Sequence, residues 1–204
     1  MVSHLWDRCI DHYDKEVTNF FDQHFTETHR QCLFIAGAGF DPRTTQMVKD
    51  VAPILGNRLN CLFIKEERPN PDKLIVEKAE KNLVSLQEMR LKNELLILNI
   101  FSDDNAVVVG INAVTKIKSI DLNQYSDIII DFSALSIGIS FPIVKYIYDK
   151  FKKDKTSINI HLVVVSNPEL DSLISSSPND RATEVRGFSR RDRLYGEVEK
   201  ARLW

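Results

Sequence analysis

The amino-acid sequence predicts an α/β fold of three layers, in which helices enclose a mostly parallel sheet of about five strands. An amphipathic helix is expected in front of this sheet. Two observations predict the fold. Short apolar runs such as 61–64 and 128–130 do not alternate with polar residues, which is typical of strands covered on both faces. Segments with helical periodicity separate these runs, as the crossover connections of a parallel sheet require.

The composition favours a globular protein and excludes several classes. Hydrophobic residues make up 43% of the chain and charged residues 27%, which argues against disorder of the whole chain. A net charge of −2 argues against a general nucleic-acid binder. The three cysteines lack CxxC spacing, so neither a disulfide framework nor a zinc ribbon is expected. Without a secretory pattern or a long apolar span, we expect a cytoplasmic location and no membrane contact.

In the N-terminal half, helical and extended patterns alternate. Residues 3–25 place apolar side chains at spacings of three and four, which predicts an amphipathic helix. The apolar run at 32–41 ends in glycines, so a buried strand and a tight turn are expected. A helix follows over 43–55, and Pro53 is expected to kink or end it. The short apolar run at 61–64 predicts the second strand.

The middle of the chain repeats this alternation. Apolar residues at helical spacing predict a helix over 72–90. The apolar run at 95–101 predicts a third strand. A further helix is expected near 108–118.

The last part of the predicted domain holds its clearest strand, at 126–131. A helix is expected over 139–153, with Pro142 in its first turn, where proline is tolerated. A continuous apolar run at 158–165 predicts the final strand.

These elements divide the chain into three parts. We expect an N-terminal helical extension at 1–30, the α/β domain at 31–168 and a polar C-terminal segment at 169–204. This last segment is rich in serine and arginine, and its final residues are apolar. We expect it either to dock on a partner or to continue into a longer natural chain.

The loop after the first strand is the foremost candidate for ligand binding, because ligands of open parallel sheets bind beyond the carboxyl ends of the strands. Gly37 and Gly39 would let backbone amides approach a ligand, and Phe40 lies beside them. Asp41 suits the N-cap of the following helix. Arg43 falls in the first helical turn, where a cation opposes the helix dipole, so an anionic partner is expected.

The stretch Ala-Gly-Ala-Gly-Phe-Asp-Pro-Arg at 36–43 resembles the cofactor loop of class I S-adenosylmethionine-dependent methyltransferases, especially the leucine carboxyl methyltransferase type. The resemblance implies a Rossmann-like fold, with Gly37, Gly39 and Arg43 facing the cofactor. It also implies that Glu66, or its neighbour Glu67, binds the ribose. The same glycines are similar to the opening of sirtuin-like NAD-binding domains, which implies NAD instead.

The loop after the strand at 126–131 carries the second set of candidates. Asp131 ends this strand and is the candidate catalytic residue, as a general base or as the ion-pair partner of Arg43. Ser133 and Ser136 follow it and could bind a ribose or a phosphate. In the alternative interpretation these groups are structural, and Ser140 caps the next helix.

No metal site is expected from the sequence. The five histidines form no ligand cluster with cysteines, and we expect them at the surface or at an interface. Four of them lie in or near the N-terminal helix, and His161 lies inside the last predicted strand.

Two functions from different classes remain open at this point. The first is binding of an adenine-nucleotide-type ligand at the carboxyl edge of the sheet, with or without catalysis. The second is a non-catalytic interaction or sensor subunit of a larger bacterial assembly, such as an antiviral defence complex, with a protein partner or as a homo-oligomer. Nucleic-acid processing is the weakest hypothesis, because acidic residues dilute the arginines near the C-terminus.

Overall fold

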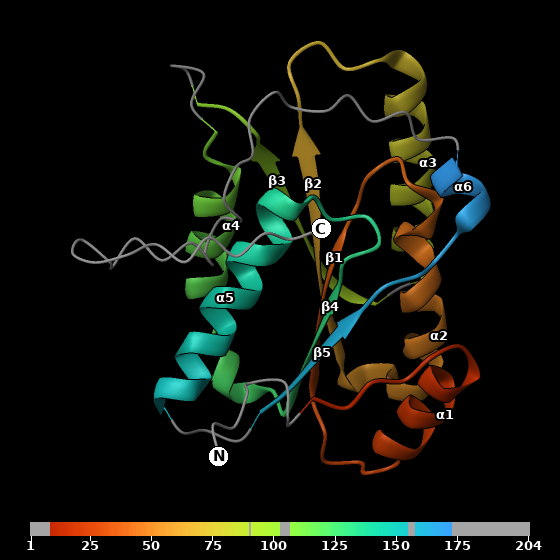
Figure 1. The fold of residues 1–204 in the computed structure, drawn as a ribbon, viewed down its shortest axis with the longest axis vertical. Helices are drawn as coiled ribbons and strands as arrows, with labels where there is room; N and C mark the ends of the chain where they lie inside the picture. Colours follow the sequence, from red (N-terminus) through yellow and green to blue (C-terminus); the bar gives the residue numbers. More distant parts are fainter. Residues whose placement is uncertain (1–8, 90, 103–106, 155–157, 173–204) are drawn as a thin grey trace, which may run out of the picture.

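The structure is a computed structural model, and it describes residues 9–89, 91–102, 107–154 and 158–172. Its sheet has five strands, all parallel, in the order β3-β2-β1-β4-β5 (Figure 1). This is the order of the first five strands of a Rossmann fold. The strands are β1 Cys32–Gly37, β2 Leu59–Glu67, β3 Lys92–Asn99, β4 Asp127–Asp131 and β5 Asn159–Val163. The predicted three-layer α/β fold is confirmed.

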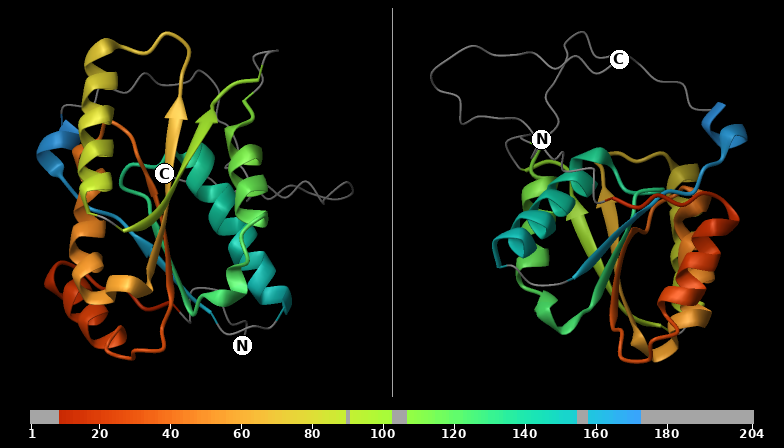
Figure 2. Two further views of the ribbon diagram at one scale, coloured as in Figure 1. Left: turned by 180° about the vertical axis from the view of Figure 1, so that it is seen from behind. Right: turned by 60° about the horizontal axis from the view of Figure 1, so that its bottom comes forward.

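Helices cover both faces of the sheet (Figure 2). One face carries α1 Lys15–His24, α2 Gln46–Leu55 and α3 Lys73–Glu88, and the other carries α4 Val109–Lys118 and α5 Ile137–Asp154. A short helix, α6 Pro168–Ser172, follows β5. Within the described ranges, turns of 3-10 helix are formed by η2 Pro42–Thr45, η3 Gly56–Arg58 and η4 Leu122–Gln124.

The two faces of the sheet form two separate apolar cores because successive strand residues point to opposite sides. Phe34 and Phe63 pack in the core beneath α1, α2 and α3. Their neighbours Ile35 and Leu62 pack in the core beneath α4 and α5. All six residues of β1 are buried, which explains why its sequence is a continuous apolar run. Full burial of a leucine, isoleucine or phenylalanine side chain stabilises the fold by about 1.5–3 kcal/mol.

The connections after β1 and β4 diverge, although these two strands are neighbours in the sheet. From β1 the chain passes to α2 on one face, and from β4 it passes to α5 on the other. Such a change of direction is the topological switch point at which Rossmann-like sheets bind ligands. The candidate loops at 37–43 and 131–136 therefore meet at one place.

The N-terminal helix is shorter than the pattern predicts. Residues 1–8 lie outside the described residues, and the chain from 9 to 13 has no regular secondary structure. Ile10 and Tyr13, expected on the apolar face of this helix, are exposed. In the described part of this segment, the buried core residues are Phe21 of α1 and Phe25, which directly follows the helix. A helix gains most of its stability by burying an apolar face, so the periodic segment is helical only where it packs.

Both prolines lie inside their helices. Pro53 does not end α2, which runs on to Leu55 and stops at Gly56, where φ is 54°. α5 begins at Ile137, so Pro142 lies in its second turn rather than its first. Proline cannot donate to the carbonyl four residues earlier, which here belongs to Gly138.

α4 packs closely against α5 beside this proline. A Cβ atom on Gly110 of α4 would lie 2.5 Å from the Gly138 carbonyl oxygen, so the two helices are in close contact at the carbonyl that Pro142 cannot serve. Ser140 donates its backbone N–H to the Ser136 carbonyl and thus lies inside the helix. The alternative prediction that Ser140 caps this helix is therefore wrong.

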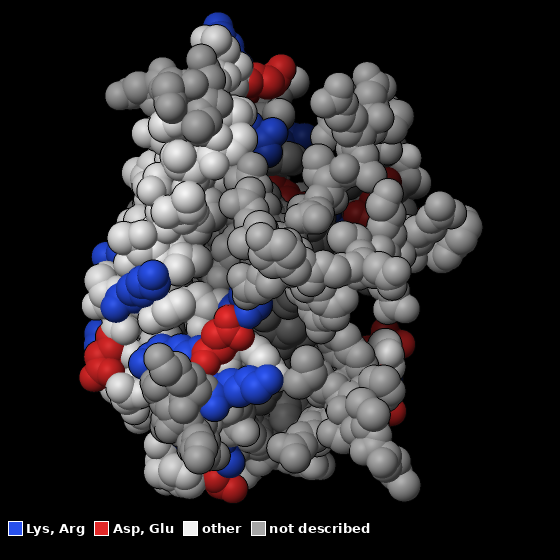
Figure 3. All heavy atoms as spheres, turned by 60° about the vertical axis from the view of Figure 1, so that its left-hand side comes forward, with Lys and Arg blue, Asp and Glu red and all other residues white. Residues whose placement is uncertain are grey.

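Two observations bear on the protein's surroundings. Among the described residues, no helix is both long and apolar enough to cross a lipid bilayer. Figure 3 shows the side on which α4 and α5 lie, and basic and acidic side chains are interspersed over its described part. Cys32 and Cys61 are buried, and Cys9 is exposed.

Candidate functional site

Gly37 ends β1 directly beneath the loop that follows β4. A Cβ atom at this position would lie 2.2 Å from the carbonyl oxygen of Ala134, far closer than any side chain permits. The next residue, Ala38, donates its backbone N–H to the carbonyl of Ile64 on β2 at 2.7 Å. The close approach of two backbone segments is therefore sufficient reason for glycine at position 37.

Gly39 differs from Gly37, because a Cβ atom there would meet no atom within 4 Å. Its neighbour Phe40 is half exposed. The side-chain amide of Asn82 on α3 donates hydrogen bonds to the carbonyls of Gly39 and Asp41, both at 2.9 Å. Asn82 thus holds the loop from behind. No feature of the sequence marks it, since polar residues are common on surface helices.

Arg43 forms a closed set of contacts with two aspartates. Asp41 accepts from Nε at 2.9 Å and from Nη2 at 2.6 Å, and Asp171 of α6 accepts from Nη1 at 3.0 Å. Asp41 also accepts the backbone N–H of Arg43 at 2.9 Å, which confirms its predicted capping role, on η2. The alternative prediction of an ion pair between Arg43 and Asp131 is wrong, because the planar guanidinium is matched by nearer carboxylates.

Asp131 lies at the carboxyl end of β4 and is only 1% exposed. Its Oδ1 accepts hydrogen bonds from the backbone N–H and the hydroxyl of Ser133. The Ser133 hydroxyl oxygen in turn accepts the backbone N–H of Val165 at 2.8 Å. The other oxygen of Asp131, Oδ2, is buried and has no partner among the described residues.

Burial raises the pKa of Asp131, and the nearby Asp41 carboxylate raises it further. The hydrogen bonds from Ser133 and the charge of Arg43 act in the opposite direction but do not cancel the rise. Asp131 is thus a carboxyl group whose charged form is costly in the folded protein. Such groups are concentrated in functional sites.

Glu66 reaches across the end of β1 from the neighbouring strand. Its Oε1 accepts the backbone N–H of Ser136 at 3.1 Å. This contact joins β2 to the loop after β4 and closes that loop over Gly37. Glu66 lies where a Rossmann-like fold presents the acid that binds a ribose. The alternative, Glu67, is exposed and lies 3.9 Å from the ammonium group of Lys65.

The structure therefore divides the predicted residues into two groups at one edge of the sheet. Asp41, Arg43, Asp131 and Ser133 form one group, to which α6 adds Asp171. Glu66 and Ser136 form the second group, beyond Gly37. In the first group Asp41 and Asp171 contact the single guanidinium, and Asp131 lies close enough for its pKa to be affected by that charge. Three carboxyl groups thus lie near one cation, and this charge balance is not that of a phosphate site.

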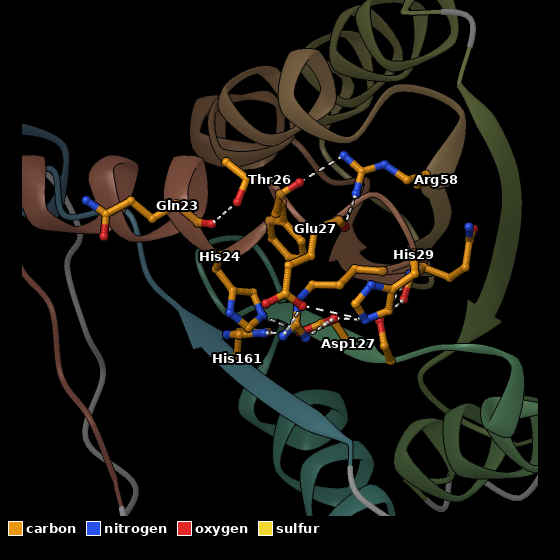
Figure 4. A network of polar contacts seen from close by, with 12 residues as sticks. Gln23, His24, Thr26, Glu27, His29, Arg58, Asp127 and His161 are labelled. Carbon is orange, nitrogen blue, oxygen red and sulfur yellow. Dashed lines mark hydrogen bonds and ion pairs between the residues drawn. The ribbon is translucent and has the colours of Figure 1, made fainter.

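A second polar network lies at the opposite, amino-terminal edge of the sheet (Figure 4). At its centre is Asp127, the first residue of β4, which is fully buried. Its Oδ1 faces Nε2 of His24 at 2.7 Å and Nε2 of His161 at 2.9 Å. Its Oδ2 contacts Arg30 at 3.3 Å and accepts the hydroxyl of Ser126 at 2.7 Å.

This network holds the pKa of Asp127 well below its usual range. Burial alone would raise this pKa, but hydrogen bonds from His161, His24 and Ser126 outweigh the effect of burial. The two histidine side chains are only 16% and 12% exposed, so neither lies free at the surface, and the alternative expectation that they lie at an interface stays a prediction. They are far apart in the sequence, and no local spacing indicates that they meet.

Aromatic rings and one arginine hold the network in place. The ring of His24 stacks on Phe20 with centroids 5.1 Å apart, and it meets Phe25 edge-on at 4.9 Å. Arg58 donates to the carbonyls of Phe25 at 3.0 Å and Glu27 at 2.9 Å. The chain that follows α1 is thereby tied to the end of α2.

The comparisons with known proteins add no identity to this geometry. A scan against protein-family models finds no matching family, and a search of curated proteins finds no significant match.

Proposed function

We propose that the carboxyl edge of the sheet binds a nucleoside-type ligand that offers hydrogen-bond donors and positive charge, of which S-adenosylmethionine is the best example. The observation that carries the proposal is the buried Oδ2 of Asp131, which lacks a partner among the described residues. Buried polar atoms are almost always paired, and each unpaired one needs an explanation. A donor group of a bound ligand would supply the missing hydrogen bond.

The charges of the site favour a cationic ligand over a polyphosphate. Arg43 is already paired with Asp41 and Asp171, and the Asp131 carboxyl group lies nearby, so a bound phosphate would have to compete with Asp41 for the guanidinium. The sulfonium and ammonium groups of S-adenosylmethionine would be attracted to the same carboxylates.

The backbone of the glycine loop also argues against a phosphate cradle. Phosphate-binding loops direct several free N–H groups at the anion. Here the N–H of Ala38 already bonds to Ile64, and those of Arg43 and Thr44 bond to Asp41. The open space above Gly39 remains for a ligand, and Glu66 would meet ribose hydroxyls beside it.

In this proposal Asp131 is the residue that moves a proton. A carboxyl group with a raised pKa is a stronger base than an exposed one, and it lies at the switch point where the ligand would sit. Ser133 orients its first oxygen and leaves the second free to act.

The test is a thermal-shift comparison of S-adenosylmethionine, NAD and ATP. A ligand present at about 100 times its Kd stabilises the folded state by roughly 2.7 kcal/mol. For a chain of this length, that corresponds to a rise in Tm of roughly 5–10 °C. We expect this rise with S-adenosylmethionine and a smaller rise with NAD or ATP.

Three variants show whether the shift comes from this site. Gly39→Val would fill the open space above the loop, and Asp131→Asn would remove the charge of the free oxygen, so both should abolish the shift. Lys49→Gln, a substitution of an exposed cation on α2, is the matched control and should retain it. A shift that survives in Gly39→Val and Asp131→Asn, or a larger shift with ATP than with S-adenosylmethionine, would overturn the proposal.

A further inference from the structure

We propose that His24, Asp127 and His161 form a zinc-binding site at the amino-terminal edge of the sheet. Two imidazole nitrogens and one carboxylate oxygen from these residues all lie within 4.8 Å of one another. They come from three elements, the end of α1, the start of β4 and the middle of β5 (Figure 4). The proposal is independent of the ligand proposed for the opposite edge.

The donor atoms are those that zinc prefers. Histidine nitrogen and aspartate oxygen bind Zn²⁺ at about 2.0–2.2 Å, so neighbouring donors of a tetrahedral site lie roughly 3.3 Å apart. In the structure Nε2 of His24 and of His161 lie 2.7 and 2.9 Å from the same Asp127 oxygen. Widening these separations to the tetrahedral spacing requires only small side-chain rotations. Three protein donors would leave the fourth position for water or a ligand.

The surroundings orient the carboxylate as a metal ligand requires. Arg30 and the Ser126 hydroxyl both bind Oδ2 of Asp127, which leaves Oδ1 directed at the two histidines. Such contacts around a metal ligand fix its orientation and support affinity. Glu27 also pairs with Arg30 at 2.9 Å, so the guanidinium charge is shared with a second carboxylate and repels a cation less.

The walls of the site favour binding as well. Phe20 and Phe25 flank the ring of His24, and Phe21 meets His161 edge-on with centroids 5.8 Å apart. These rings limit the directions in which the histidines can turn and exclude water from the carboxylate. A bound ion would join α1 to β4 and β5, so we expect it to fasten the N-terminal helix to the sheet.

The test uses the full chain without a histidine tag, stripped with a chelator and titrated with ZnCl₂ in a calorimeter. We expect one Zn²⁺ per chain, and tetrahedral visible absorption when Co²⁺ replaces it. His24→Gln and His161→Gln should each weaken binding by about tenfold or more, on the order of what lost metal-site contacts cost. His29→Gln is the matched control, because His29 is exposed and contacts Glu27 beside the network without facing Asp127.

Two results would overturn the proposal. One is a wild-type chain that binds no Zn²⁺ under these conditions. The other is binding that His24→Gln and His161→Gln leave unchanged, which would place the ion elsewhere. Circular dichroism of the metal-free variants separates lost binding from lost folding. Because His24 is more exposed than His161, His24→Gln is expected to disturb the fold less.

Discussion

The two aspartates that begin and end β4 provide the sharpest test of the reasoning. Asp127 and Asp131 are buried to the same extent, 0% and 1% exposed, and lie about 13 Å apart along one strand. Their pKa values shift in opposite directions, downward for Asp127 and upward for Asp131. Replacing each with asparagine preserves size and removes the charge. The two substitutions should therefore have opposite effects on stability.

Asp127→Asn should be strongly destabilising at pH 7. The carboxylate has four hydrogen-bonding partners, and the amide that replaces it is uncharged and keeps a single acceptor oxygen, so Arg30 loses its buried counter-ion and part of the network loses its acceptor. Removing one partner of a buried ion pair costs about 3–5 kcal/mol. For a chain of this length, this corresponds to a fall in Tm of roughly 6–20 °C.

Asp131→Asn should leave stability unchanged or raise it by about 1 kcal/mol, because it removes a buried charge with one unpaired oxygen. The side-chain carbonyl of the substituted amide can still accept both hydrogen bonds from Ser133. A gain in stability on substitution is typical of residues kept for function rather than folding.

The pH dependence follows from the signs of the two shifts. The lowered pKa of Asp127 contributes stability that is present above about pH 4, its unfolded value, and is lost as pH falls through the folded value. The raised pKa of Asp131 contributes stability that is present below about pH 4 and is lost as pH rises through the folded value. The loss of stability caused by Asp127→Asn and the gain of stability caused by Asp131→Asn should thus both grow as pH rises from acid towards neutral.

The assay is urea unfolding of chelator-treated wild type and both variants between about pH 3 and pH 7, the range that spans the ordinary aspartate pKa, followed by circular dichroism. Equal destabilisation by the two substitutions, with parallel pH profiles, would refute the assignment of opposite roles. The same result would remove the argument that Asp131 is held ready for a ligand.

Three further predictions concern the loop and the thiols. Gly37→Ala should destabilise the fold by about 1–3 kcal/mol in urea unfolding, because its Cβ would overlap a backbone carbonyl. Gly39→Ala should change stability by less than about 0.5 kcal/mol, because a Cβ there meets no atom. Equal effects of the two substitutions would contradict the crowded surroundings of Gly37 and the open space at Gly39. Asn82→Ala should cost about 1–2 kcal/mol in the same assay and lower ligand affinity, since two loop carbonyls lose their donor. In the native protein, a thiol reagent should modify Cys9 alone, because Cys32 and Cys61 are buried. Burial raises the pKa of both buried thiols, that of Cys61 to about 12. Rapid modification of all three cysteines would contradict the packing of β1 and β2.

The larger prediction that the chain acts as a non-catalytic subunit of an assembly has a separate test. Native mass spectrometry of the purified chain should then show a dimer or a larger species. A monomer in that measurement and in cell extract would count against it. None of the described contacts favours this prediction over ligand binding.

Local patterns were sufficient to predict most elements and the edge at which the candidate residues lie. β1 and β4 are covered on both faces, and their apolar residues follow one another without polar residues between them, which is typical of parallel sheets. Parallel strands all end at one edge, so the residues after them had to gather there. The limits of α1 and α5 were less predictable, because a helix ends where its packing ends.

The partners of individual side chains depend on the tertiary structure alone. Arg43 pairs with Asp171 because α6 returns to the first loop, and the order of strands in the sheet is what allows this. His24 and His161 meet at Asp127 because β5 lies beside β4 and α1 packs over the same edge. Periodicity reports whether a residue faces a core or water. Which distant residue it then contacts is set by strand order and helix packing, which no local spacing records.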